Sequence, residues 1–296
     1  MYFWRGYYFG KEGIWCRDFN KEEAFCVLKD PLYKDYMVRA IADNGKTIAV
    51  SRNIGTNEPL LMVDVDKKTI KNTISNHTFI YPCLDREGSK VFSVTKSDIY
   101  KNIYGNPFCV DAETGKVIAT LDEKTQWGNT AYHPESNSVY FSAFKQPNLY
   151  KFNFDTLAFS AVSTDKKIRI FDCKVACDNK GYYYLGSNIL VYMNNEDEEV
   201  WRINFKEKEK LSGKTLFSIC LSDNPDYIAV YLLDGNWLFI VNRNDFSYKK
   251  YKLGRVGFSE FFNNSLLFIY KNDNLSTLNL ETLEEKPFLP TTSTSL

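Results

Sequence analysis

Short apolar runs alternate with polar turns along the whole of this chain. Runs of four or five residues are apolar at both odd and even positions, at 47–51, 91–95, 139–143, 182–185, 228–232 and 266–270. Each follows a turn rich in Asp, Asn, Gly, Ser or Lys, and the first four of these residue types favour tight reversals of the chain. Because strands with apolar side chains on both faces are buried between sheets, the pattern predicts an all-β chain of stacked sheets.

The strands and turns recur as a repeat of about 44 residues. Each unit begins with a small residue or Cys, and continues with a polar turn, a buried strand, a third strand and a second turn. The residues that mark the units are Ala40, Cys83, Ala131, Ala176 and Cys220, with Glu260 in this place in the last unit. Their spacing of 40 to 48 residues is the period of a four-stranded propeller blade.

Six full units and one shorter N-terminal unit predict a single domain, a seven-bladed β-propeller of four-stranded antiparallel blades. The N-terminal unit, 1–30, has three strands, and we expect the tail, 290–296, to add the fourth and so close the ring through both chain ends. A disordered Ser/Thr tail is the alternative. The full blades are predicted at about 36–74, 79–124, 127–163, 171–206, 215–253 and 256–289.

Two units carry a family resemblance. Residues 46–51 with Val63 and Asp64, and residues 90–95 with 110–116, resemble blades of bacterial YVTN-type and WD-repeat-like propellers, and the resemblance spans nearly the whole chain. The Gly-His and Trp-Asp dipeptides of true WD repeats are absent. The resemblance therefore implies the propeller fold without implying a particular class of partner.

Composition narrows the range of partners. Lys plus Arg and Asp plus Glu are equal at 37 each, so no net positive field attracts a nucleic acid.

The chain begins without the features of a secretion signal and has no apolar stretch long enough to span a membrane, so we expect a cytoplasmic protein. The seven cysteines include one close pair, Cys173 and Cys177, and with only two histidines they do not make a zinc site. We expect no metal and no cofactor.

Few residues suit catalysis. His77 follows a predicted fourth strand and could reach the mouth of the central tunnel, whereas His133 lies in a turn on the opposite rim. Glu260 is the one carboxylate among the small residues of the innermost strands. It is either a functional acid or a sign that the last unit is aligned one residue out of register, which is the interpretation we favour. An enzyme alternative, a lactonase-like hydrolase or lyase, would use Glu260 and His77.

The connections on one rim are rich in aromatic residues and Arg, the residue types that dominate protein-binding hot spots. The longest connection, 96–107, either projects as a recognition loop or packs over its own blade. The predicted partner-binding residues are Tyr33, Tyr36, Arg52, Tyr81, Lys96, Tyr100, Tyr104, Trp127, Phe144, Arg169 and Arg255.

These observations favour a non-enzymatic, monomeric propeller that binds another protein. The abundance of Lys, Asn and Tyr is typical of an AT-rich bacterial genome. A cytoplasmic propeller of that origin suggests an immunity or inhibitor protein that neutralises a cognate toxin. A sensory or scaffold propeller is a further alternative that the sequence does not separate from this one.

Overall fold

The computed structural model describes most of the chain as short antiparallel strands. Contacts between residues divide it into two compact units: residues 1–145 with 149–161 make the first unit, and the remaining residues make the second. Each unit is described by itself. The structure describes residues 2–8, 11–17, 24–29, 36–52, 58–94, 105–123, 127–143, 149–162, 164–165, 167–176, 178–209, 216–221, 226–232, 237–253, 259–263, 266–271 and 274–287.

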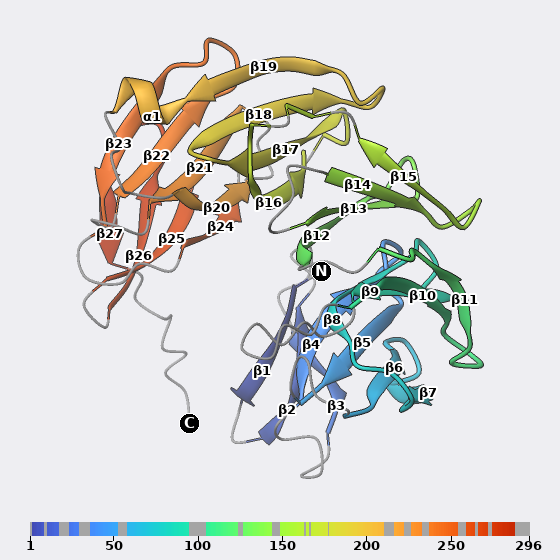
Figure 1. Ribbon diagram of the computed structural model, residues 1–296. Coiled ribbons are helices and arrows are strands. Elements are labelled where there is room, and N and C mark those ends of the chain that lie inside the picture. Colours follow the sequence, from blue (N-terminus) through green and yellow to red (C-terminus); the bar gives the residue numbers. More distant parts are fainter. Residues whose placement is uncertain are drawn as a thin grey trace, which may run out of the picture. The chain divides into compact units, whose positions relative to one another are not determined.

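The described residues of the first unit form four antiparallel sheets (Figure 1). Sheet 1 has three strands, β1 (Tyr2–Tyr8), β2 (Lys11–Arg17) and β3 (Ala24–Leu28). Sheet 2 consists of β4 (Met37–Ile41), β5 (Thr47–Ser51), β6 (Leu60–Asp64) and β7 (Thr69–Ile74). Sheet 3 consists of β8 (Ile80–Leu84), β9 (Lys90–Val94), β10 (Pro107–Asp111) and β11 (Val117–Thr120). Sheet 4 consists of β12 (Trp127–His133), β13 (Ser138–Ala143), β14 (Leu149–Asn153) and β15 (Ala158–Val162).

The second unit contains three four-stranded sheets and one short helix in its described part. Sheet 5 consists of β16 (Ile170–Val175), β17 (Gly181–Gly186), β18 (Ile189–Asn194) and β19 (Glu199–Asn204), and α1 (Phe205–Lys208) follows it. Sheet 6 consists of β20 (Leu216–Leu221), β21 (Tyr227–Leu232), β22 (Trp237–Asn242) and β23 (Tyr248–Lys252). Sheet 7 consists of β24 (Ser259–Asn263), β25 (Leu266–Lys271), β26 (Asn274–Asn279) and β27 (Glu285–Pro287).

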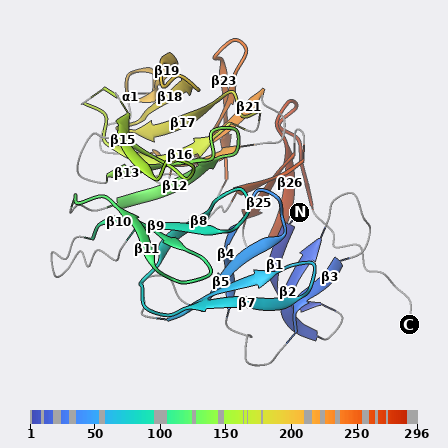
Figure 2. The ribbon, with the colours of Figure 1, turned by 90° about the vertical axis from the view of Figure 1, so that its right-hand side faces the viewer.

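Strands follow one another across each sheet in sequence order. The first strands of neighbouring sheets lie together: β4 is next to β8 and β8 next to β12 in the first unit, and β16, β20 and β24 follow the same rule in the second. Both ribbon views show β4 beside β8 (Figure 1 and Figure 2). We call the first strand of each four-stranded sheet its inner strand and the fourth its outer strand.

Apolar side chains on the second and third strands make the core between neighbouring sheets. Ile48 and Val63 of sheet 2 pack with Ile14 of sheet 1, and Phe92 of sheet 3 packs with Phe141 and Phe152 of sheet 4. The two-sided apolar runs of the sequence are thus buried, as stacked sheets require. Cys83, Cys109 and Cys173 are free thiols in the core, and burial raises the pKa of Cys83 and Cys173.

Candidate functional site

Each of the inner strands β4, β8, β12, β16 and β20 contains a β-bulge near its start. In β4, Val38 pairs with Val50 and Ala40 with Ala49, so Arg39 is an extra residue without a partner across the sheet. A bulge breaks the alternation of side chains and re-aims one of them. The other four pairing shifts lie between Ile80 and Cys83, Trp127 and Thr130, Ile170 and Asp172, and Leu216 and Ser218.

Tyr81 lies in the bulge of β8 and is presented to solvent. Its φ is +49°, which is uncommon for a residue with a side chain, and 41% of it is exposed. The Thr130 hydroxyl donates to the Tyr81 carbonyl at 3.1 Å, which ties β8 to β12. Ser93 fixes the other side of β8, because its hydroxyl accepts the Ile80 N–H at 2.8 Å and donates to the Ile80 carbonyl at 2.9 Å. The surroundings therefore hold Tyr81 in a conformation that an isolated strand would not adopt.

The bulge of β4 orders a second part of this surface. Arg39 donates from Nε to Ser51 Oγ at 3.1 Å and from Nη2 to the Arg52 carbonyl at 2.6 Å, and its burial lowers its pKa. The exposed Arg52 guanidinium lies 5.3 Å from the ring centre of Tyr36. That ring is buried in the core, so the expectation that Tyr36 contacts a partner is corrected: Tyr36 supports Arg52.

Met37, Arg52 and Tyr81 make up what we call the inner-strand surface. Met37 is 45% exposed and pairs with Ser51, the residue before Arg52, while Tyr81 belongs to the neighbouring inner strand. Met, Tyr and Arg are enriched at protein interfaces. Two of these residues, Arg52 and Tyr81, are among the predicted partner-binding residues. Met37 was missed because it belongs to a strand and not to a connection.

The other predicted partner-binding residues do not gather in one described place. Arg169 is exposed in the second unit, and its N–H donates to Ser187 Oγ at 3.0 Å. Trp127 begins β12 opposite Ala143, with only its backbone described. The six that lie outside the described residues are Tyr33, Lys96, Tyr100, Tyr104, Phe144 and Arg255.

His77 lies between sheets 2 and 3, beside the outer strand β11. Its Nε2 is 3.0 Å from the Gly115 carbonyl, and its ring packs against Phe108 with a centroid separation of 5.4 Å. A cavity of about 470 Å³ here is also lined by Val117 and Thr120 of β11. The expectation that His77 reaches the mouth of a central tunnel is therefore wrong, because its ring packs on β10 and its Nε2 contacts the turn before the outer strand β11.

Strand pairing places Glu260 in the same column as the small residues of the other inner strands. Glu260 pairs with Phe268, the third residue of β25. The third residue of β17, Tyr183, pairs with Lys174. The interpretation of Glu260 as an alignment slip is therefore wrong. The slip lies instead in sheet 5, where Lys174 and not Ala176 occupies the column. The remaining pairs of the column are Ala40 with Ala49, Cys83 with Phe92, Ala131 with Tyr140, and Cys220 with Ala229.

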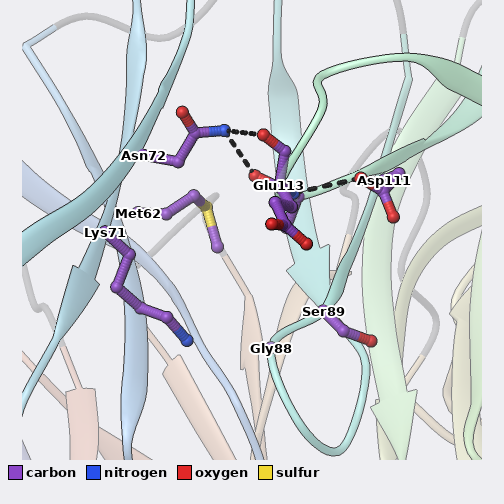
Figure 3. A pocket seen from close by; sticks show the side chains of 8 residues that line it. Met62, Lys71, Asn72, Gly88, Ser89, Asp111 and Glu113 are labelled. Atoms are coloured by element: carbon purple, nitrogen blue, oxygen red, sulfur yellow. Dashed lines mark hydrogen bonds between the residues drawn. The ribbon is translucent and has the colours of Figure 1, made fainter.

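A groove of about 300 Å³ between sheets 2 and 3 opens on the edge formed by the polar turns (Figure 3). Asn72 donates from Nδ2 to the carbonyls of Ala112 and Glu113, at 2.7 and 2.6 Å, and so joins the two sheets. The Asp111 carboxylate accepts N–H groups of its own turn. Lys71 extends away from the carboxylates of Asp111 and Glu113 (Figure 3). The groove is a joint between sheets, in which Asn72 and Asp111 hold the turn at 111–115.

Comparison with known proteins agrees with this architecture. No protein-family model and no curated protein matches the sequence. Among solved structures, the β-propeller domain of Cps50 (Swd1) from Myceliophteria thermophila matches 85% of this chain and 84% of its own, with a TM-score of 0.58 and 10% sequence identity. The fold is a β-propeller.

The seven sheets are the blades of this propeller, so the predicted all-β class with four-stranded antiparallel blades is confirmed. At 10% identity the likeness is one of fold alone. The YVTN-type resemblance stays a prediction, and so does closure by the tail, since 288–296 lie outside the described residues.

Two further findings concern the part of the propeller that the structure describes. Its one helix, α1, has four residues, and no helix there is long and apolar enough to cross a bilayer. Within the same residues, no three His, Cys, Asp or Glu side chains come together as a metal site would require.

Proposed function

We propose that this propeller binds another protein through the inner-strand surface and has no catalytic activity of its own. The observation that carries the proposal is Tyr81, an exposed aromatic side chain held at positive φ by hydrogen bonds from two neighbouring strands. The backbone at Tyr81 is fixed in this way before a partner arrives, so it loses little conformational freedom on binding, which favours affinity. Met37 and Arg52, which belong to the neighbouring sheet 2, supply an adaptable apolar contact and a cation.

We further propose that the partner is a toxin of the same bacterium and that the propeller neutralises it in the cytoplasm. The composition supports this proposal, because the abundance of Lys, Asn and Tyr fits an AT-rich bacterial genome. Rigid display of Tyr81 also suits an inhibitor, which must stay bound without a conformational change. In the hydrolase or lyase alternative, Glu260 keeps its expected place on an inner strand, but His77 does not, because its Nε2 lies 3.0 Å from the Gly115 carbonyl in the turn before the outer strand β11.

Quantitative affinity capture from the native host tests the binding surface. The wild-type propeller is expected to retain one partner in stoichiometric amount, and Tyr81→Ala to weaken its binding by about 30-fold, as for a central hot-spot residue. Val200→Ala, which truncates an exposed apolar residue of the outer strand β19, is the matched control and is expected to bind normally. Equal capture by both variants would contradict the proposed surface.

Co-expression tests the toxin separately. The captured partner, expressed alone, is expected to arrest growth, and co-expression of the propeller to restore it. Tyr81→Ala is expected to restore growth less well at equal expression. A partner that does not affect growth would reject the toxin while leaving the binding surface intact.

A further inference from the structure

Arg52 of the inner-strand surface and its neighbour Arg39 have no carboxylate partner among the described residues. Arg39 uses two of its five N–H groups, one toward Ser51 Oγ and one toward the Arg52 carbonyl. The Arg52 guanidinium lies over the Tyr36 ring and donates to no described residue. Glu58, in the connection to β6, forms an ion pair with neither arginine, and nor does any other described carboxylate. Two positive charges therefore lack a counter-charge in the part of the chain that the structure describes.

Arg39 is tied to the face of sheet 2 that packs on sheet 3. Its acceptor Ser51 follows Ala49 by two residues in β5, so these two side chains share a face of the sheet. Ala49 lies in one core cluster with Phe108 of sheet 3, so this is the face toward sheet 3. The strand of sheet 3 beside β4 is β8, which carries Tyr81. The Arg39 guanidinium therefore lies on the side of sheet 2 that faces the sheet of Tyr81.

Partial burial of Arg39 makes its charge costly while it is unpaired. Desolvation lowers the pKa of Arg39, and no described carboxylate opposes this effect. A guanidinium nevertheless stays charged at neutral pH. A carboxylate from outside would form a charge-assisted and geometrically specific pair with it. A protein that covered this surface without a carboxylate would leave the charge unpaired in the interface, which weakens binding.

We propose, on the basis of the protein-binding function above, that the partner places one Asp or Glu carboxylate against Arg39 and Arg52. Met37 and Tyr81 then contact apolar side chains beside that carboxylate. The hydrogen bonds of Arg39 hold its guanidinium in place before the partner arrives, and the Tyr36 ring does the same for Arg52. The two arginines therefore select among partners, because only one with a carboxylate at this point satisfies them.

The surroundings favour a carboxylate of a protein over the phosphates of a nucleic acid. Binding of a nucleic acid needs several cations along a track, whereas the chain as a whole has equal numbers of acidic and basic residues. The two arginines are accompanied by Met37, 45% exposed, and Tyr81, 41% exposed. A few cations among apolar side chains are typical of protein interfaces.

Equilibrium binding of the captured partner, measured between about 50 and 500 mM NaCl, tests the carboxylate contact. The affinity of the wild-type propeller is expected to fall as salt rises. Arg52→Gln is expected to bind about tenfold more weakly at low salt and to lose most of this salt dependence, because the charge pair is gone. Arg39→Gln is expected to behave in the same way. Thermal melts show whether the variants are folded, and the exposed Arg52 keeps the test decisive if Arg39→Gln is not.

Two further variants separate this contact from the binding surface as a whole. Lys67→Gln removes an exposed cation of the same sheet, in the turn after β6, and is expected to bind like wild type at every salt concentration. Tyr81→Ala is expected to bind weakly and to keep the wild-type salt dependence. Arginine variants with wild-type affinity and salt dependence overturn the carboxylate contact, while a weakened Tyr81→Ala still supports the surface. Normal binding by Tyr81→Ala as well would reject both.

Substitutions in the partner identify the acceptor. Each exposed Asp or Glu of the partner is replaced by Asn or Gln, and one such variant is expected to lose about as much affinity as Arg52→Gln. Combining that variant with Arg52→Gln is expected to cost little more than either change alone, because both remove the same pair. If dephosphorylation of the partner removes the salt-dependent binding and none of these substitutions does, the arginines bind a phosphate and the proposal is overturned.

Discussion

An Asp or Asn side chain caps the turn after the third strand of every four-stranded sheet. Its Oδ1 accepts N–H groups two to four residues further along, which is why these residue types recur there. The repeat in the sequence predicted a second turn at this place in each unit. Asn194 caps its turn like the others. The capping residues are Asp64, Asp111, Asn153, Asn194, Asn242 and Asn279.

Asp111 makes this cap sensitive to acid. Hydrogen bonds from the N–H and the hydroxyl of Thr114 hold the pKa of Asp111 below its usual value. Its stabilising effect is therefore complete above the ordinary carboxyl pKa of about 4, and is lost as pH falls through the lowered folded value. We expect Asp111→Asn, which keeps the acceptor, to melt with a weaker pH dependence between about pH 5 and 2 than wild type. Asp111→Ala is expected to cost about 1 kcal/mol at pH 7. The prediction would be contradicted if the melting temperatures of Asp111→Asn and of wild type fell by the same amount over this pH range.

Burial of single aromatic residues could not be predicted from the sequence. Tyr36 and Phe79 lie in connections, as expected, but both are core residues. The same residue types fill cores and make hot spots, so residue type does not separate the two. Lys174 was missed for a related reason: the column was identified by small side chains, and the pairing of strands does not depend on side-chain size.

At the scale of elements, the turn after a third strand reaches back to the preceding sheet. Lys68 of sheet 2 lies over the ring of Phe25 in sheet 1, at 5.3 Å. Lys249 of sheet 6 donates to the Glu281 carbonyl of the next turn at 2.6 Å. Arg243 forms the strongest of these joints, since Nη1 pairs with Asp178 at 2.7 Å and Nη2 donates to the Tyr192 hydroxyl at 2.9 Å. These contacts hold neighbouring sheets in register.

Removal of the Arg243 joint is expected to destabilise the second unit. Arg243→Ala leaves Asp178 and Tyr192 largely buried without their donor, at a cost of about 2–3 kcal/mol in the free energy of unfolding by urea. Arg202→Ala is the control, because it removes the same side chain from more exposed pairs with Glu199 and Asp165 and is expected to cost less than about 1 kcal/mol. Equal losses in the two variants would show that the joint between sheets adds nothing.

The elements themselves were predictable, and the bulges were not. Alternating apolar runs and turn residues give the strands, because burial and turn geometry act within a few residues. A bulge depends on pairing with the next strand, and its distance from the column residue varies. Arg39 lies one residue before Ala40, whereas Phe171 lies three before Lys174. The inner-strand surface therefore needed the structure.

At the scale of the whole molecule, the period of the repeat carried the prediction of the fold. A solved propeller with 10% sequence identity shares the architecture, so the fold does not require the same residues. The repeat does not predict how the ring closes, because closure depends on the one copy of the repeat that differs from the rest. Sheet 1 has three strands in the described residues.

Deletion of 290–296 tests closure of the ring. If the tail adds the fourth strand to sheet 1, the deletion is expected to lower Tm by about 2 °C or more, in proportion to the lost pairing. A variant with the tail replaced by seven alternating Gly and Ser residues controls for chain length and is expected to melt like the deletion. An unchanged Tm would mean that sheet 1 is complete with three strands.

The backward reach of the turns has a consequence for synthesis on the ribosome. Each joint connects a turn to a sheet that was translated earlier, as Arg243 connects to Asp178 and Tyr192. A newly emerged sheet thus finds its docking surface already made and does not wait for later sequence. Assembly can proceed in the order of translation, which limits the time that apolar strand faces remain exposed in the cell.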